Sequence, residues 1–370
     1  MIQKKKKIPC VVFHKQVKHN DLIWPAKSIG VIPFYKDDLS LAKLVLNRDI
    51  ELQPIDYYFP DYKEGSDARR LFTHIGNGIG DIFAFSSMAW YLRDYPLQVH
   101  VTKRFHPVFD WFKREDIHLM DYYQPIGLDY GLGSRLTKYR GLQRLAIENA
   151  AVEYHTGNWY EAHFKRIGLD QTPGGYGRPM LKNYRISNLA SDIPFGSASI
   201  LISHRASCQM RSSHLEDFYN PIRQLYQNHN IYVHEIDLTP TDKEFAKRNP
   251  SINILPKCSV SNYLLNLYDA GLVVSTDSSA IHFREGTERP AVGVFGAMLQ
   301  SSRTSGYKFT HSFDVKTGCQ FQPCVIHEKF SGQVCTNADE GDRVARCQSG
   351  KVFQEQLFNE LKHYERNRQG

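Results

Sequence analysis

From Leu71 onward, short apolar runs alternate with longer amphipathic ones, and this alternation limits the fold to parallel strands covered by helices. The first half of the pattern is "LFTHI", a glycine-rich loop, an amphipathic run from Ile82 to Asp94 that Pro96 halts, and then "LQVHVT". Parallel strands need a long crossover between them, and the amphipathic run supplies it as a helix. The segment therefore predicts a βαβ unit.

The alternation resumes beyond "QTPGGYGRPMLKNY", a stretch rich in glycine and proline that is typical of a linker. The strands that we expect there are "SILISH", "IYVHEID", "INILP", "GLVVST" and "AVGVFG". We expect one helix in "HLEDFYNPIRQLYQN", which Pro221 should kink, and another in "SVSNYLLNLYDAG", capped by Ser259 or Ser261. This order predicts a second parallel sheet.

The two halves predict an α/β chain with two Rossmann-like domains that face each other across a cleft, with ligands at the carboxyl ends of the strands. We place the first domain at residues 71–185 and the second at 186–350. Residues 1–70 contain short β-rich runs and predict a β-rich elaboration packed on the first domain. A chain of 370 residues, 41% of them hydrophobic, is long enough for two globular domains.

Charge and hydropathy narrow the setting and the partners. No run approaches the roughly 18 apolar residues of a membrane span, and the start "MIQKKKKIPC" lacks the apolar segment of a signal peptide, so we expect a cytoplasmic protein without an integral membrane segment. A formal charge of +7 favours acidic partners, among them nucleotides, anionic membrane surfaces in peripheral contact, and nucleic acid. The basic run Lys4 to Lys7 reads as a solvated tail.

The glycine loop "GNGIGD" keeps the backbone bare at the start of the first predicted helix. A dinucleotide or methyl-donor site also needs an acid at the end of the next strand to hold the ribose, and Lys103 and Arg104 follow that strand instead. The loop does carry Asp81 directly after its last glycine. Glycines allow another molecule to approach closely, and an exposed carboxylate can accept a proton or cap the helix.

The segment 273–296 carries the motif that points to a family. It contains a buried strand, Asp277, two hydroxyls at a helix start, His282 five residues after the aspartate, and Pro290 opening the next strand. It resembles the D-[ST]-G-x-x-H signature of the heptosyltransferase-like glycosyltransferases, glycosyltransferase family nine, which have the GT-B fold. "VFG" followed by Arg303 and Tyr307 continues the likeness.

Two further stretches are similar to that family in the right order. "GIGDIFAFSSMAWYLRDYP" resembles its first-domain G-x-G-D motif, and "SHRASCQMRSSHLEDF" resembles the loop that places a hydroxyl and a basic side chain at the donor phosphates, here Ser207 and Arg211. The resemblance spans roughly residues 70–360. It implies that the closing run "VFQEQLFNELKHYERN", within residues 351–370, is a helix that packs back across the domain junction.

The resemblance also implies an inverting transfer that needs no metal and no cofactor beyond a nucleotide-diphosphate sugar as co-substrate. Asp81 is then the general base, because a carboxylate must remove the proton of the acceptor hydroxyl. The first glycine loop lies on the acceptor side and comprises Gly76, Asn77, Gly78 and Gly80. The predicted donor-binding residues are Ser207, Arg211, Asp277, Ser278, Ser279, Ala280, His282 and Arg303.

Cysteines gather near the C-terminus at Cys319, Cys324, Cys335 and Cys347. Their gaps are wider than those of the tight C-x₂₋₄-C knuckles of structural zinc, although His311 and His327 lie close in the sequence. We therefore expect no bound metal. An odd total of seven cysteines in the chain also argues against a disulfide framework.

The sequence thus predicts a metal-independent GT-B glycosyltransferase that moves a sugar to an acceptor hydroxyl with inversion, most simply on a saccharide. A hydroxylated DNA base, as modified by viral DNA glycosyltransferases, is an alternative acceptor that suits the basic charge. A module that binds a nucleotide sugar or a glycan without turnover is a further alternative. The residues do not identify the nucleotide, the sugar or the oligomeric state.

Overall fold

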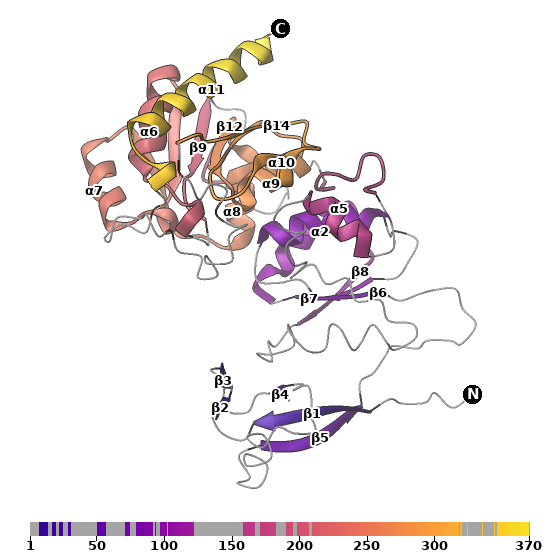
Figure 1. Cartoon of the computed structure of the whole chain (residues 1–370). Helices are drawn as coiled ribbons and strands as arrows, with labels where there is room; N and C mark the ends of the chain where they lie inside the picture. Colours follow the sequence, from indigo (N-terminus) through magenta and orange to yellow (C-terminus); the bar gives the residue numbers. More distant parts are fainter. Residues whose placement is uncertain are drawn as a thin grey trace. The chain divides into compact units, whose positions relative to one another are not determined.

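The computed structural model describes most of the second half of the chain and separate segments of the first. The described residues are 7–13, 17–19, 22–24, 29–30, 50–56, 71–74, 79–91, 93, 97–101, 103–121, 158–166, 171–182, 190–194, 198–206, 209–317, 319, 324, 335, 344 and 346–369. The chain divides into two compact units (Figure 1). Unit 1 is Met1–His74, Asp94–Lys103 and Asp116–Glu148, and unit 2 is Ile75–Arg93, Arg104–Glu115 and Asn149–Gly370.

Unit 1 contains antiparallel strands followed by a parallel sheet. β1 (Lys7–Phe13) pairs along its length with β5 (Ile50–Asp56) and at its end with β4 (Ile29–Gly30). β2 (Val17–His19) and β3 (Leu22–Trp24) form a hairpin. β6 (Leu71–His74), β7 (Leu97–Val101) and β8 (Ile117–Asp121) then pair in parallel in that order. The parallel pairing of β6 and β7 agrees with the βαβ reading of this segment.

Unit 2 is built on a six-stranded parallel sheet with the order β11-β10-β9-β12-β13-β14. Its strands are β9 (Ser199–Ser203), β10 (Asn230–His234), β11 (Ile252–Leu255), β12 (Leu272–Thr276), β13 (Ala291–Phe295) and β14 (Thr310–Asp314). In chain order this is the 3-2-1-4-5-6 arrangement of a Rossmann sheet. The strand order reverses between β9 and β12, and the loops after these two strands are therefore the expected place for a ligand.

Helices cover both faces of this sheet. α6 (Leu215–Leu225), which contains Pro221, and the closing helix α11 (Lys351–Gln369) pack on one face, where Phe218 and Phe353 stack 5.5 Å apart over a core that includes Ile202 and Val274. α7 (Pro240–Arg248) begins at a capping box between Thr239 and Asp242 and adds Phe245 to the same core.

The other face carries α8 (Val260–Asp269) and α9 (Ser279–Gly286). Ile281 of α9 packs on Phe295, whose strand neighbour Val294 points to the α6 and α11 side, since side chains alternate along a strand. α10 (Gln300–Thr304) follows β13, and the short 3₁₀ helices η2 (Gln209–Arg211), η3 (Glu235–Asp237) and η6 (Arg346–Gln348) fill loops.

Two helices from the first half of the sequence belong to unit 2. α2 (Ile79–Tyr91) packs on α9, with Phe83 and Phe283 rings 5.3 Å apart, and α5 (Trp159–Arg166) packs on α2 and α10. The sequence predicted an amphipathic helix here, but every residue of α2 from Ile82 to Ala89 is buried. The 3₁₀ helix η1 (Lys103–Trp111) leads to an isolated bridge between Phe112 and Leu181.

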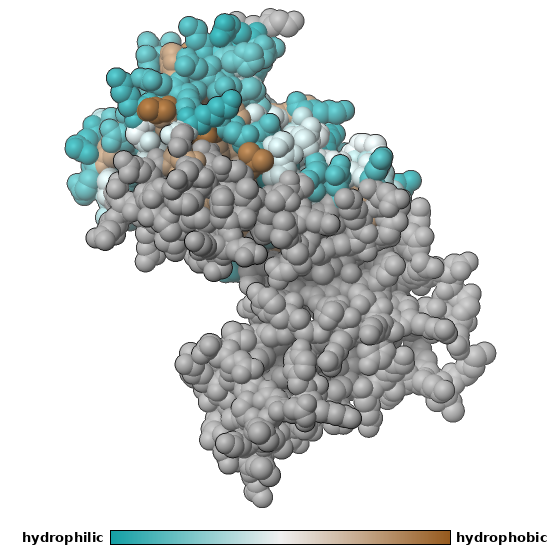
Figure 2. Space-filling model, in the orientation of Figure 1, coloured by the Kyte–Doolittle hydropathy of each residue, from teal (hydrophilic) through white to brown (hydrophobic). Residues whose placement is uncertain are grey.

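The surface of the described part of unit 2 is mainly hydrophilic on the face drawn in Figure 2. Its exposed large hydrophobic residues are Ile236, Ile254, Leu299, Phe309 and Val352. Among the helices in the described part of the chain, none is both long enough and apolar enough to cross a membrane.

Candidate active site

The site is built on the turn that joins β12 to α9. Ser278 is the N-cap of α9, and its hydroxyl accepts from the Ala280 N–H at 3.2 Å. The Ser275 hydroxyl donates to the Thr276 carbonyl at 2.8 Å, so the 2.8 Å contact between the Ser275 and Ser278 hydroxyls uses the proton of Ser278. The Ser278 hydroxyl thus accepts from the Ala280 N–H and donates to the Ser275 hydroxyl. The helix predicted to start at these hydroxyls is present, and Ser278 is its N-cap; the role of Ser278 in donor binding stays a prediction.

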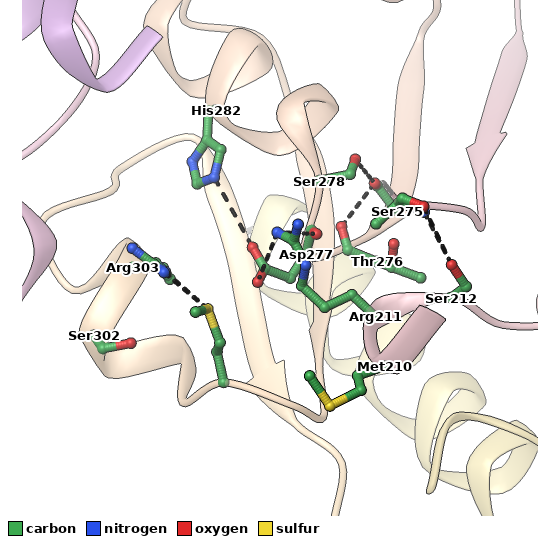
Figure 3. A network of polar contacts seen from close by, with 12 residues as sticks. Met210, Arg211, Ser212, Ser275, Thr276, Asp277, Ser278, His282, Ser302 and Arg303 are labelled. Atoms are coloured by element: carbon green, nitrogen blue, oxygen red, sulfur yellow. Dashed lines mark hydrogen bonds and ion pairs between the residues drawn. The ribbon is translucent and has the colours of Figure 1, made fainter. Parts of the chain in front are cut away.

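Arg211 reaches this turn from η2, on the loop after β9. Its Nη1 lies 3.2 Å from the Asp277 carbonyl oxygen and 3.4 Å from Asp277 Oδ2 (Figure 3). The Asp277 side chain is 2% exposed, whereas that of Arg211 is 25% exposed. The aspartate is therefore part of the framework, and the arginine extends from it toward solvent.

His282 lies one helical turn into α9, above Asp277 (Figure 3). Its Nε2 is 4.0 Å from Asp277 Oδ1, and its Nδ1 is 2.6 Å from the Tyr307 hydroxyl. Burial lowers the pKa of His282 from 6.5 to about 3, because the neighbouring Asp277 carboxylate only partly offsets the desolvation. The imidazole is neutral at physiological pH.

Arg303 of α10 also lies near His282 (Figure 3). Its guanidinium lies 4.6 Å from the ring centroid of Trp159, and its Nε and Nη2 contact Met298 Sδ at 3.1 and 2.9 Å. The Trp159 ring in turn meets the His282 ring edge-on, with centroids 5.1 Å apart. Arg303 is therefore buried against the Trp159 ring. A cation in this position can stabilise the packing, contact a ligand, or do both.

The first turn of α2 lies against the first turns of α9. A methyl group added to Gly80 would sit 3.4 Å from His282 Cδ2 and 3.8 Å from Ser279 Cα. Asp81, the next residue, is partly exposed in that first turn. The structure therefore brings the predicted base and the predicted donor turn into one neighbourhood, although the two are nearly 200 residues apart in the sequence.

Several predicted site residues cannot be placed. Gly76, Asn77 and Gly78 of the acceptor loop and Ser207 of the donor loop lie outside the described residues. The described positions Gly80, Asp81, Arg211, Asp277, Ser278, Ser279, Ala280, His282 and Arg303 all belong to unit 2.

Sequence reasoning missed the contribution of α5. Asn158 caps this helix, since its Oδ1 accepts from the Tyr160 and Glu161 N–H groups at 2.9 and 3.2 Å. Its amide donates to Ser305 Oγ at 2.6 Å, and the Tyr160 hydroxyl lies 2.9 Å from that of Tyr307. The asparagine before "WYEAHF" could have been predicted to cap a helix, but the local sequence does not indicate that its amide contacts Ser305.

The predicted cysteine group is close behind η2. Cys324 shares a small core with Met210 and Ala297, against which Cys335 packs, and Cys347 is buried nearby. Burial raises the pKa of the Cys347 thiol to about 12, and the other cysteines add to the shift. Among the described residues, no group of three or more histidine, cysteine or acidic side chains has an arrangement that would hold a metal ion.

The arrangement suits an anion. The N-terminus of α9 carries a partial positive charge, and the planar guanidinium of Arg211 stands beside it. Both groups would stabilise negative charge that develops on a ligand there.

The chain is similar to known proteins in structure, but the sequence comparisons find no match. No protein-family model matches the chain, and no curated protein matches it. The structure of a glycosyl transferase family 9 protein from Veillonella parvula is 10% identical, with 80% of this chain and 97% of that chain covered and a TM-score of 0.52.

Two solved enzymes of E. coli give similar values. ADP-heptose LPS heptosyltransferase II is 12% identical, with 81% of this chain and 100% of that chain covered and a TM-score of 0.50. The dodecameric iron-containing heptosyltransferase TibC, in complex with ADP-D-β-D-heptose, is 12% identical, with 85% and 82% covered and a TM-score of 0.53. The chain is thus similar in fold to family-nine glycosyltransferases and heptosyltransferases, which confirms the resemblance first seen in its motifs.

Proposed function

We propose that the chain is an inverting glycosyltransferase of the GT-B type, which transfers a sugar from a nucleotide-diphosphate donor to an acceptor hydroxyl. Residues 186–350 bind the donor, residues 71–185 present the acceptor across a cleft, and the closing helix within 351–370 packs on the donor-binding part through Phe353, Leu357 and Leu361. The observation that carries the proposal is the pairing of Arg211 with the turn at Asp277, at the point where the strand order of the sheet reverses.

The donor diphosphate binds at the N-terminus of α9. The backbone N–H of Ser279 contacts one phosphate, and Arg211 holds the other oxygens. The neutral His282 adds a hydrogen bond without a competing charge. Of the proteins that are similar in fold, TibC was solved with ADP-D-β-D-heptose and another is an ADP-heptose heptosyltransferase, so an adenosine diphosphate heptose is the first donor to examine.

Asp81 acts as the general base at the acceptor side. It takes the proton of the acceptor hydroxyl while that oxygen forms a bond to the anomeric carbon. The bond between the anomeric carbon and the phosphate oxygen breaks, and its electron pair leaves with the nucleoside diphosphate. Attack opposite the leaving group inverts the anomeric centre. The loop of Gly76, Asn77, Gly78 and Gly80 leaves room for the acceptor.

We propose a saccharide as the acceptor, no metal or organic cofactor, and a cytoplasmic enzyme that touches anionic surfaces at most peripherally. The support for a saccharide is that the name of heptosyltransferase II refers to a lipopolysaccharide. A hydroxylated DNA base and binding without turnover are the competing outcomes of the test below.

The test is a thermal-unfolding panel of nucleoside diphosphates and their sugars. A ligand at about 100 times its dissociation constant stabilises the folded chain by roughly 2.7 kcal/mol, which raises the melting temperature measurably. We expect one nucleoside class to stand out. If no nucleoside diphosphate changes the melting temperature, the proposal that this site binds the donor is wrong.

The donor identified in this way is then incubated with glycan and with DNA containing hydroxylated bases, and release of the nucleoside diphosphate is measured. Release that depends on the glycan supports the proposal. Release that depends on DNA, with DNA retention that falls steeply as salt rises, would favour the DNA acceptor. Binding without any release would favour the non-catalytic module.

A further inference from the structure

A chain of hydrogen-bonding groups runs from α5 to the donor turn. The Tyr160 hydroxyl is 2.9 Å from the Tyr307 hydroxyl, which is 2.6 Å from His282 Nδ1. On the other side of the ring, His282 Nε2 faces Asp277 Oδ1 at 4.0 Å. In the described part of the chain, the hydroxyl that contacts Nδ1 is that of Tyr307, and the hydrogen bond made at one ring nitrogen influences which nitrogen carries the proton.

All three members of this chain are neutral. Burial raises the pKa of Tyr160 and that of Tyr307 well above their usual value of 10. Burial likewise lowers the pKa of His282 to about 3. The chain of hydroxyls and imidazole therefore carries no net charge at physiological pH, and what it can do is orient protons.

Counting protons selects one tautomer. The Asp277 carboxylate, which pairs with Arg211, has only acceptor atoms, so a bare Nε2 lone pair opposite it would be repelled, whereas an Nε2–H would be attracted. Nδ1 is then an acceptor, and Tyr307 donates to it. The single proton of Tyr307 is thereby used, so Tyr160 donates to the Tyr307 oxygen. Every proton in the chain points toward Asp277.

The orientation of the ring is fixed as well. The ring of Trp159 meets that of His282 edge-on, and the backbone of Gly80 lies beside Cδ2. Turning the imidazole by half a turn would place Cδ2 against the Tyr307 hydroxyl and would lose the 2.6 Å contact. The tautomer and the direction of Nε2 are therefore set together.

We propose that Tyr307 is a positioning residue that holds His282 as the Nε2–H tautomer. The neutral Nε2–H group then points toward Asp277, in the turn between β12 and α9 where the nucleotide sugar would bind. The inference rests on the proposed function for its consequence, because a preset N–H at this place would stabilise charge that develops on the leaving diphosphate. Tyr160 supports Tyr307 one step farther away.

The experiment reads the tautomer directly in the unliganded chain. The protein is labelled with ¹⁵N-histidine, two-bond ¹H–¹⁵N correlations are recorded, and His282 is assigned by its absence in His282→Gln. We expect the proton on Nε2 in the wild type. In Tyr307→Phe we expect a mixture with the Nδ1–H form. Tyr160→Phe is the matched control, because it removes a hydroxyl from the same chain but leaves Tyr307 able to donate, so the Nε2–H form should persist.

A wild-type His282 protonated on Nδ1 would overturn the inference, and so would an unchanged tautomer in Tyr307→Phe. If Tyr307→Phe does not fold, the wild-type spectrum still decides. With an active donor, Tyr307→Phe should lower kcat about tenfold or more and leave donor KM nearly unchanged, since the lost interaction belongs to the transition state. A chain that shows the expected tautomers but binds no nucleoside diphosphate would refute the proposed function and leave the positioning role standing.

Discussion

The Nη1 of Arg211 donates to both the backbone carbonyl and the carboxylate of Asp277, at 3.2 and 3.4 Å. This contact joins the loop after β9 to the loop after β12, the two loops that flank the reversal of strand order. Because Asp277 is buried and Arg211 is partly exposed, the contact presents the guanidinium next to the N-terminus of α9. The consequences proposed for this geometry can be measured one at a time.

Replacing Asp81 by asparagine distinguishes a general base from a residue that only stabilises the first turn of α2. Asparagine keeps the size and hydrogen-bonding capacity of aspartate in the first turn of α2 but cannot take a proton, so transfer should fall by roughly 100-fold or more while the fold and donor affinity persist. Glu161→Gln is the matched control, because Glu161 is an acid in the first turn of α5. Steady-state kinetics and thermal unfolding of both variants are the measurement. An Asp81→Asn enzyme with more than about a third of wild-type turnover would show that the carboxylate is not the base.

Removing metal should leave the enzyme active. We expect full turnover in EDTA and no stoichiometric metal in the purified chain, because the helix N-terminus and Arg211 supply the positive charge that a cation would otherwise provide. Elemental analysis is the measurement, and it is informative because TibC is described as iron-containing. About one zinc or iron per chain, lost together with the fold when Cys347 is replaced by serine, would contradict the expectation.

Acid should destabilise the chain through buried histidines. Burial lowers the pKa of His234 to about 4 and that of His282 to about 3, from 6.5. Below pH 6.5 the unfolded state therefore binds protons that the folded state does not, and the free energy of unfolding falls as the pH falls, by up to about 1.4 kcal/mol per unit for each group. Denaturant titrations between pH 7 and 4 measure this slope.

His234→Gln should flatten that slope, and His363→Gln on the exposed side of α11 should not change it. Equal slopes for the wild type and both variants would show that the buried histidines do not control acid stability.

The sequence predicted the parts of the fold that local pattern determines. β9, β12 and β13 are continuous apolar runs and were found as strands, and α8 begins at Ser259, whose hydroxyl accepts from the Asn262 N–H as a cap should. α7 was missed although Thr239 and Asp242 form a readable capping box. The amphipathic run was predicted to begin at Ile82, but α2 begins at Ile79, and its first turn lies against α9 at Gly80.

The contacts that complete the site could not be predicted in this way. Tyr160 and Tyr307 are 147 residues apart, and their contact depends on how α5 and α10 pack. Arg211 and Asp277 were each singled out, yet their pairing follows from the strand order, which periodicity does not determine. Motifs thus indicate which residues matter, whereas tertiary packing sets what each one touches.

Calorimetric titration measures whether a nucleoside diphosphate binds beside Arg211. ADP is titrated first, then the other nucleoside diphosphates, into the wild type, Arg211→Ala and the control Arg223→Ala, whose guanidinium donates to the His229 carbonyl at 3.2 Å. A charge-assisted contact is worth about 1.5 to 3 kcal/mol, so Arg211→Ala should weaken binding roughly 10- to 150-fold while the control binds as the wild type does. Equal affinity in Arg211→Ala and the wild type, or no binding by the wild type, would contradict the account.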